Sequence, residues 1–176
     1  DMTKLIAVPS AAESYNLPSS VTKLSDGALA GLSIKGASDL SEVTEIGDYA
    51  LSGSAFTSVK LNPSITTIPE GMFLEAENLT SVTGIENIKK IGAYGFCKTK
   101  ITTLKLPSLA EVGEYAFSDS TLNSISADKT EIIGDNAFGS CLLTEAYFPS
   151  AHFVGKEAFA GNLSLMKVTL GGVTEM

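Results

Sequence analysis

Hydrophobic residues recur along the chain in two short phrases that alternate with each other. The first phrase is an aliphatic residue, usually a glycine, two variable residues, a small residue and an aromatic residue, as in Val112-Gly113-Glu114-Tyr115-Ala116-Phe117. The second phrase is apolar-x-x-apolar-x-apolar, as in Ile101-Thr102-Thr103-Leu104-Lys105-Leu106. Its last three residues alternate between apolar and polar, which is the period-2 pattern of a half-buried β-strand. The pattern therefore predicts one short strand in each repeat.

The first phrase recurs at a nearly constant interval of 21–23 residues, and its copies begin at Leu24, Ile46, Ile68, Ile91, Val112, Ile133 and Val154. This period lies within the range of about 20–29 residues that is typical of leucine-rich repeats, which stack as coils of a solenoid. We therefore predict an α/β-type, right-handed solenoid with one short parallel strand per repeat. Short helical turns or loops are expected opposite the strands.

Proline positions sharpen this match. Residues 17–29 run from a Leu-Pro pair into the first phrase, and similar pairs occur at Leu106-Pro107 and Phe148-Pro149. From Tyr15 onward the chain resembles the BspA-like class of leucine-rich repeats, in which a strand ends in Leu-Pro and a later segment ends in Ile-Gly-x-x-Ala-Phe. The resemblance implies an extracellular or surface-anchored binding module.

In a solenoid, equivalent residues of successive coils form columns along the axis. We expect two aliphatic columns under the strands, and a stack of rings in the interior formed by Phe73, Phe96, Phe117, Phe138 and Phe159. Leu29 and Leu51 replace the phenylalanine in earlier copies. The repeated glycine is expected at a tight turn, where the backbone needs either freedom or a close approach.

An acidic column follows the glycines and contains Asp26, Asp48, Glu70, Glu114 and Asp135. Stacked carboxylates offer the oxygen ligands that calcium prefers. The alternative, which we favour, is that each acid begins a short helical turn whose free N–H groups attract an anion. Ala93 and Lys156 interrupt the column, which disfavours a metal ladder.

We expect residues 1–176 to form a single solenoid domain of about seven repeats. Residues 1–13 do not fit the repeat and are interpreted as an N-terminal cap, and Leu32–Lys35 lead into an irregular repeat. The last residues, 173–176, parallel 43–46 and would begin an eighth copy, so we expect the natural chain to continue. No signal peptide is visible, although a removed one would leave the same sequence.

Composition excludes several classes of function. The net charge of -8 has the wrong sign for a protein that binds the phosphate backbone of nucleic acids. No apolar run approaches the roughly 18–20 residues needed to cross a bilayer. One His and two Cys cannot complete a four-ligand zinc site of the Cys/His type. No nucleophile elbow, phosphate loop or dinucleotide fingerprint is present. We therefore predict no catalytic, cofactor or metal site, and no enzyme activity.

The two cysteines are predicted to be buried free thiols. Cys97 and Cys141 lie two coils apart, which is roughly 9–10 Å at a strand spacing of about 4.8 Å. An unstrained disulfide requires a Cα separation below about 7 Å. His152 is the one imidazole of the chain, and we expect it on the surface without a catalytic role.

Residues that alternate with the buried strand positions point outward and form a candidate protein-binding face. Three of the 12 cations lie on it, and Tyr147 offers a rigid amphipathic ring of the kind that anchors interfaces. A solvated sheet face without a ligand is the alternative. The candidate residues are Lys60, Thr83, Thr103, Lys105, Ser126, Glu145, Tyr147, Lys167 and Thr169.

Two functions are compatible with these features. The first is a secreted or cell-surface interaction module, an adhesin that binds host or microbial proteins through the sheet face, and is expected to be monomeric. The second is a rigid spacer that displays another domain and has no ligand of its own. The adhesin hypothesis rests on analogy at the level of the fold.

Overall fold

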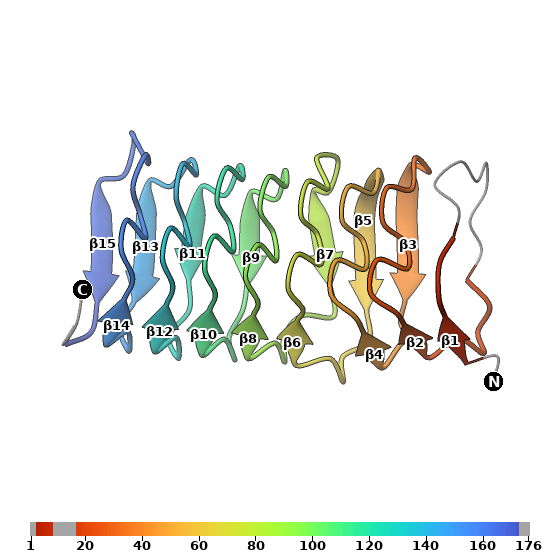
Figure 1. Cartoon of the computed structure of the whole chain (residues 1–176). Coiled ribbons are helices and arrows are strands. Elements are labelled where there is room, and N and C mark those ends of the chain that lie inside the picture. The colour runs from red at the N-terminus through yellow and green to blue at the C-terminus, as the bar shows by residue number, and fades with distance from the viewer. Residues whose placement is uncertain (1–2, 9–16, 173–176) are drawn as a thin grey trace.

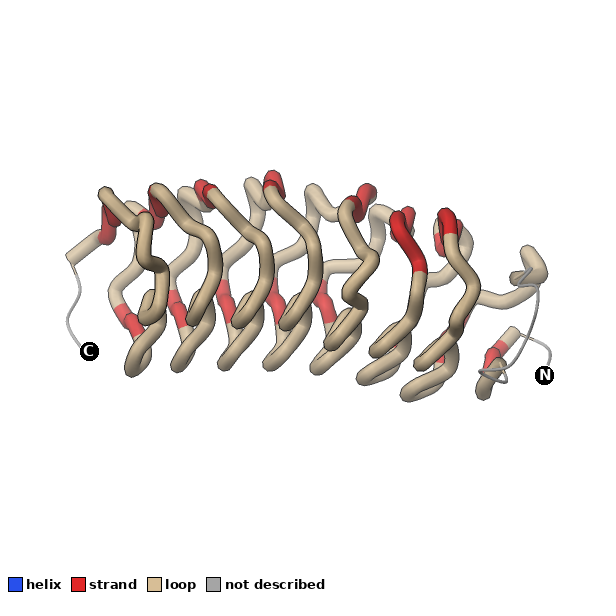
Figure 2. The backbone as a smooth tube through the Cα atoms, turned by 90° about the horizontal axis from the view of Figure 1, so that it is seen from above, coloured by secondary structure: helices blue, strands red, loops and turns tan. Residues whose placement is uncertain are grey.

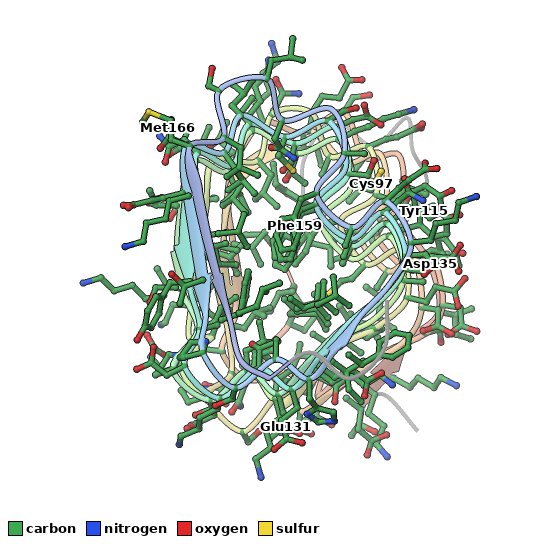
Figure 3. All side chains as sticks on the ribbon, turned by 90° about the vertical axis from the view of Figure 1, so that its left-hand side faces the viewer. Cys97, Tyr115, Glu131, Asp135, Phe159 and Met166 are labelled. Carbon is green, nitrogen blue, oxygen red and sulfur yellow. The ribbon has the colours of Figure 1, made fainter. Side chains whose placement is uncertain are left out.

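The computed structural model describes residues 3–8 and 17–172, which form an elongated parallel β-solenoid of about eight coils (Figure 1). The described residues contain fifteen strands and no helix (Figure 2). Viewed from its C-terminal end, the chain descends the long strands, crosses the base and rises past Asp135, so the coil is right-handed (Figure 3). The predicted solenoid is confirmed.

Each regular coil contributes two strands rather than the one that we predicted, and the paired strands are parallel. The longer strands form the major row: β3 (Gly36–Leu40), β5 (Phe56–Leu61), β7 (Ser81–Thr83), β9 (Thr103–Lys105), β11 (Ser124–Ser126), β13 (Glu145–Phe148) and β15 (Lys167–Leu170). Two-residue strands form the minor row: β1 (Lys4–Leu5), β2 (Lys23–Leu24), β4 (Glu45–Ile46), β6 (Thr67–Ile68), β8 (Lys90–Ile91), β10 (Glu111–Val112), β12 (Ile132–Ile133) and β14 (Phe153–Val154). Two residues are too few for a period-2 pattern, so the minor row was not visible in the sequence.

The ends of the predicted domain are only partly described. Residues 1–2 and 9–13 of the predicted cap lie outside the described residues, as do residues 173–176, where an eighth copy was expected. Within the cap, β1 pairs in parallel with β2 as a further member of the minor row. The irregular repeat after Leu32 contains β3, which pairs with β5 through a register shift at Gly36/Ala37.

The segment opposite the major row is a series of turns without a helix, so of the helical turns or loops that we expected there the structure has loops. Each regular coil places two residues four positions apart in the left-handed region, as at Tyr115 (φ 53°) and Asp119 (φ 57°). A right-handed helix cannot continue through such residues. Instead, the amides of Tyr115, Phe117 and Asp119 donate to the carbonyls of Asp135, Ala137 and Gly139 in the next coil, at 2.7–2.9 Å.

The same three bonds link every neighbouring pair of coils from the one that starts at Leu24 to the one that starts at Val154. We call this row of bonds the turn ladder. The intervening amides donate within their own turn, as from Ser118 to the Tyr115 carbonyl at 3.1 Å. Because neighbouring amides alternate between these two partners, the buried turn satisfies its backbone polar groups without a helix.

The predicted phenylalanine stack is confirmed and lies directly inside the turn ladder. The Phe117 ring is stacked between those of Phe96 and Phe138, with centroids 5.3 Å away on both sides. Phe73 and the half-buried Phe159 extend the stack at its two ends. Leu29 and Leu51 are fully buried and continue the column toward the N-terminus.

Close approach explains the glycine column. Gly113 does not adopt a positive φ. A Cβ atom at this position would lie 2.7 Å from the Ala93 nitrogen and 2.8 Å from the Gly92 carbonyl carbon in the preceding coil. Real Cβ atoms do not approach backbone this closely, so a side chain here would force the two coils apart.

Each row of strands is interrupted once. The major row divides between β7 and β9, and the minor row divides between β4 and β6. In Figure 1 the strands on either side of both interruptions stand farther apart than their other neighbours in the same row. The turn ladder crosses both interruptions, so the array stays continuous there.

Replacing Phe117 by Ala should lower the free energy of unfolding by about 3–5 kcal/mol, because rings on both sides prevent the gap from collapsing. Phe159→Ala at the end of the stack is a matched control with a smaller expected loss. Denaturant unfolding measures both values. A loss below about 1 kcal/mol for Phe117→Ala would contradict a structural role for the stack.

Gly113→Ala should lower the free energy of unfolding by about 1–3 kcal/mol through overpacking between coils. Gly172→Ala is the control, because a Cβ there would meet no atom within 4 Å. It should change stability by less than about 0.5 kcal/mol. Equal effects of the two substitutions in thermal or denaturant unfolding would rule out close approach as the cause.

Candidate binding face

The outward side chains of the major row form two columns, because parallel pairing aligns equivalent residues of successive strands. In the C-terminal sheet, one column contains Thr103, Ser124, Glu145 and Lys167, and the other contains Lys105, Ser126, Tyr147 and Thr169. The intervening side chains of Leu104, Ile125 and Ala146 point inward and are buried. This alternation fixes which side chains reach solvent.

The interruption of the major row divides the predicted face. Seven of the nine predicted residues lie on the sheet of β9, β11, β13 and β15 and line one groove. The other two, Lys60 and Thr83, are neighbours on the separate sheet of β3, β5 and β7. Eight of the nine residues are exposed, and Thr169 is half-buried.

The groove has a volume of about 530 Å³ and runs over β11. Ser124 and Ser126 are short, so they form a low floor between larger side chains on both sides. Lys105 rises from β9 on one side, and Tyr147 rises from β13 on the other with 44% of its surface exposed. One recess is therefore surrounded by hydroxyl groups, an amphipathic ring and charged side chains.

Ion pairing distinguishes the two sheets. On the N-terminal sheet the Lys60 ammonium lies 3.3 Å from a carboxylate oxygen of Asp39 on β3. Hydrogen bonds from Ser41, with a smaller contribution from Lys60, hold the pKa of Asp39 below its usual value. Around the groove, no ion pair within the described ranges involves Lys105, Glu145 or Lys167. The groove therefore keeps its charges available to a partner.

Sequence reasoning missed Asp39 because its repeat is irregular. Its position 21 residues before Lys60 was the available signal, since that interval equals the repeat period. The interruption of the major row between β7 and β9 could not be predicted in this way, because the apolar-polar alternation of the sequence does not change there.

The three aspartates of the acidic column contact backbone amides rather than helix termini. The carboxylates of Asp26, Asp48 and Asp135 accept hydrogen bonds from the amides of Asp48, Glu70 and Lys156 in the next coil, at 2.7–3.1 Å. Our helix-start interpretation is therefore wrong, because no helix is present in the described residues. Within those same ranges, no group of three or more His, Cys, Asp or Glu side chains could hold a metal ion.

A family model described as the BspA type leucine rich repeat region matches residues 9–123 and 110–175, with six copies. The chain belongs to this family. No curated protein matches it. The described residues contain no helix that is long and apolar enough to cross a membrane.

Solved structures share the fold of this BspA-type chain. A leucine-rich cell surface protein from Faecalibacterium prausnitzii matches 98% of the chain with 21% identity and a TM-score of 0.75. A leucine-rich repeat protein from Bacteroides ovatus matches 89% with 22% identity and a TM-score of 0.51. The pneumococcal vaccine antigen PcpA matches 97% with 15% identity and a TM-score of 0.50. The chain covers 48%, 54% and 55% of these proteins, about half of each.

The two thiols of this BspA-type chain are free and buried, as predicted. The Cys141 thiol donates to the Phe117 carbonyl at 3.0 Å, inside the turn ladder. Burial raises the pKa of both Cys97 and Cys141 from 9.0 to about 11. Both thiols therefore stay protonated at neutral pH, where a protonated thiol is a poor nucleophile.

A thiol reagent at about pH 8 should label neither cysteine of the folded chain and both cysteines after denaturation. Because the folded pKa values are raised, the neutral thiols contribute full stability below about pH 9, and this contribution falls as the pH rises toward 11. Mass spectrometry of labelled protein and melting curves across this range measure both effects. Rapid labelling of the native protein at pH 8 would contradict burial of the thiols.

Proposed function

We propose that this chain is a single-domain, non-enzymatic protein-interaction module that acts at a cell surface and binds a partner protein through the sheet of β9, β11, β13 and β15. The observation that carries the proposal is the groove over β11, where the exposed Tyr147 ring faces Lys105 across a floor of serines. Interface energy concentrates in a few central aromatic or charged residues, and this groove provides both kinds.

The rest of the face suits recognition of an extended partner. The side chains are held on a rigid sheet, so binding would cost little ordering of the site itself. The charged groups around the groove have no competing ion pair there, so they can steer a partner of complementary charge. Surface location is supported by the family and by the cell surface protein with the same fold. Within this reading, an adhesin for host or microbial proteins is the specific role that we propose.

The spacer function is the second candidate, and the continuous turn ladder favours it. Bonds of 2.7–3.0 Å run through every coil from Gly27 to Ala160, which suits a stiff rod. A rod of this kind needs no ligand. The two candidates differ in whether the groove over β11 contributes to any interaction of the protein.

The test begins with a partner captured from extracellular-matrix or serum proteins and then measures affinity for variants of the groove. Tyr147→Ala should weaken binding by about 1–3 kcal/mol and leave the melting temperature nearly unchanged, because the ring points outward. Lys105→Glu should slow association, and the effect should shrink with added salt. Surface plasmon resonance separates the two rates.

Thr83→Ala is the matched control, since this residue occupies the same column on the other sheet. It should leave the affinity unchanged. If the partner binds the Tyr147→Ala, Lys105→Glu double variant as tightly as the wild type, the groove is not the binding site. If no partner is captured, the spacer function becomes the better explanation.

A further inference from the structure

The interruption of the minor row between β4 and β6 leaves a cleft of about 720 Å³ on a different face from the groove over β11. Elsewhere in this row, each coil accepts amides of the next. Thr22 accepts from Thr44 at 2.8 Å, and Thr66 accepts from Lys89 at 2.7 Å. Between β4 and β6 the equivalent bond from Thr66 to the Thr44 carbonyl is missing from the described backbone contacts.

The sequence explains why the two strands separate here. Nine positions separate Val59 on β5 from Ile68 on β6, against eight between Ser38 on β3 and Ile46 on β4. The longer corner displaces β6 from its neighbour. In addition, Pro69 stands where five other copies have a glycine whose amide donates to the preceding coil, and proline has no N–H to donate.

The cleft is bounded at both ends by contacts between the same two coils. At one end the Asn62 side-chain amide donates to the Ser41 carbonyl at 2.6 Å. At the other end the Tyr49 amide donates to the Glu70 carbonyl at 2.8 Å. The opening is therefore a short slot rather than a general loosening of the solenoid.

Backbone N–H and C=O groups at the edges of β4 and β6 line this slot. Within the described part of the chain, the amides of Thr66 and Thr67 have no backbone acceptor, and the carbonyls of Thr44 and Ile46 have no backbone donor. All four residues line the cleft. Such unpaired strand edges readily pair with another extended chain.

The slot also reaches the hydrophobic core. Ile46 is only partly buried, whereas the next members of its column, Ile68, Ile91 and Val112, are fully buried. An aliphatic side chain entering the slot would cover Ile46 and remove apolar surface from water. The inward position of an added strand therefore favours an aliphatic residue.

The rim of the slot is acidic. Glu45, Asp48 and Glu70 line it, and the single lysine there, Lys90, is paired with Glu111 at 2.7 Å. The outward position of an added strand would lie beside Glu45 and Thr67, which favours lysine or arginine. Lys23 already contacts Glu45 from its other side at 2.7 Å, which shows the geometry of such a pair.

We propose that the slot between β4 and β6 binds a short extended segment of a partner polypeptide that carries a basic residue followed by an aliphatic residue. The segment adds a parallel strand between β4 and β6. Its amides donate to the Thr44 and Ile46 carbonyls, and its carbonyl accepts from Thr66 and Thr67. This site is separate from the proposed groove over β11, so either can fail without the other.

The probe is the acetylated, amidated peptide Ile-Lys-Lys-Ile-Gly, which has the sequence of residues 88–92 and so matches the strand that already pairs with β6. Hydrogen exchange followed by NMR on the whole chain locates its binding. In the free protein, the amides of Thr66 and Thr67 should exchange at least tenfold faster than those of Lys89 and Lys90. Saturating peptide should slow the exchange of Thr66 and Thr67 at least tenfold.

Variants test the two chemical requirements. Glu45→Lys should weaken peptide binding about tenfold, whereas Glu131→Lys, the same charge change at an exposed position outside the slot, should leave it unchanged. A peptide with Asp in place of its second Ile should lose binding at least tenfold, because the carboxylate would enter the core.

Three results would overturn the proposal. The slot is closed if Thr66 and Thr67 exchange as slowly as Lys89 and Lys90 in the free protein. The site is absent if the peptide leaves the exchange of Thr66 and Thr67 unchanged. Binding is a general charge effect if Glu45→Lys and Glu131→Lys weaken it equally.

Discussion

The row of backbone hydrogen bonds along the turns, with the phenylalanine stack inside it, is the constraint on which the solenoid depends. Three amides per coil donate to the next coil in every neighbouring pair from Gly27 to Ala160. Both rows of strands are interrupted, but this ladder is not. Since Phe73, Phe96, Phe117 and Phe138 each donate their own amide to the ladder, the same residues order the backbone and fill the core.

The turn ladder explains the backbone conformations and residue types of the columns beside it. Residues in the left-handed region orient every second amide of the turn along the solenoid axis. Tyr94 and Lys98 adopt this conformation although they are not glycines. Coils held this close leave no room for a side chain at Gly113. The aspartates beside the glycines add bonds of the opposite direction between the same coils, as from the Glu70 amide back to the Asp48 carboxylate. A conformational strain of about 1 kcal/mol at each non-glycine left-handed residue is offset by these repeated contacts.

Because the turns hold the coils together, the strand rows are free to vary, and both proposed binding surfaces lie on these rows. Continuous pairing from β9 to β15 aligns Lys105, Ser126 and Tyr147 across a groove. One extra residue before Ile68, together with Pro69, opens a slot in the minor row. Regular strand pairing thus gives a face of aligned side chains, whereas a local mismatch in coil length leaves backbone N–H and C=O groups unpaired.

The sequence by itself determined the repeat class, the direction of the side chains in the major row and the interior phenylalanine stack. These follow from a period of 21–23 residues and an apolar-polar alternation, which constrain every coil in the same way. It also located the nine candidate face residues on the outward side. Only the tertiary structure decided that the turns are not helical, that the minor row exists and that both rows break. Those features depend on which backbone groups of one coil pair with those of the next. A change of one residue in coil length, such as that before Ile68, alters this pairing but leaves the repeated phrases unchanged.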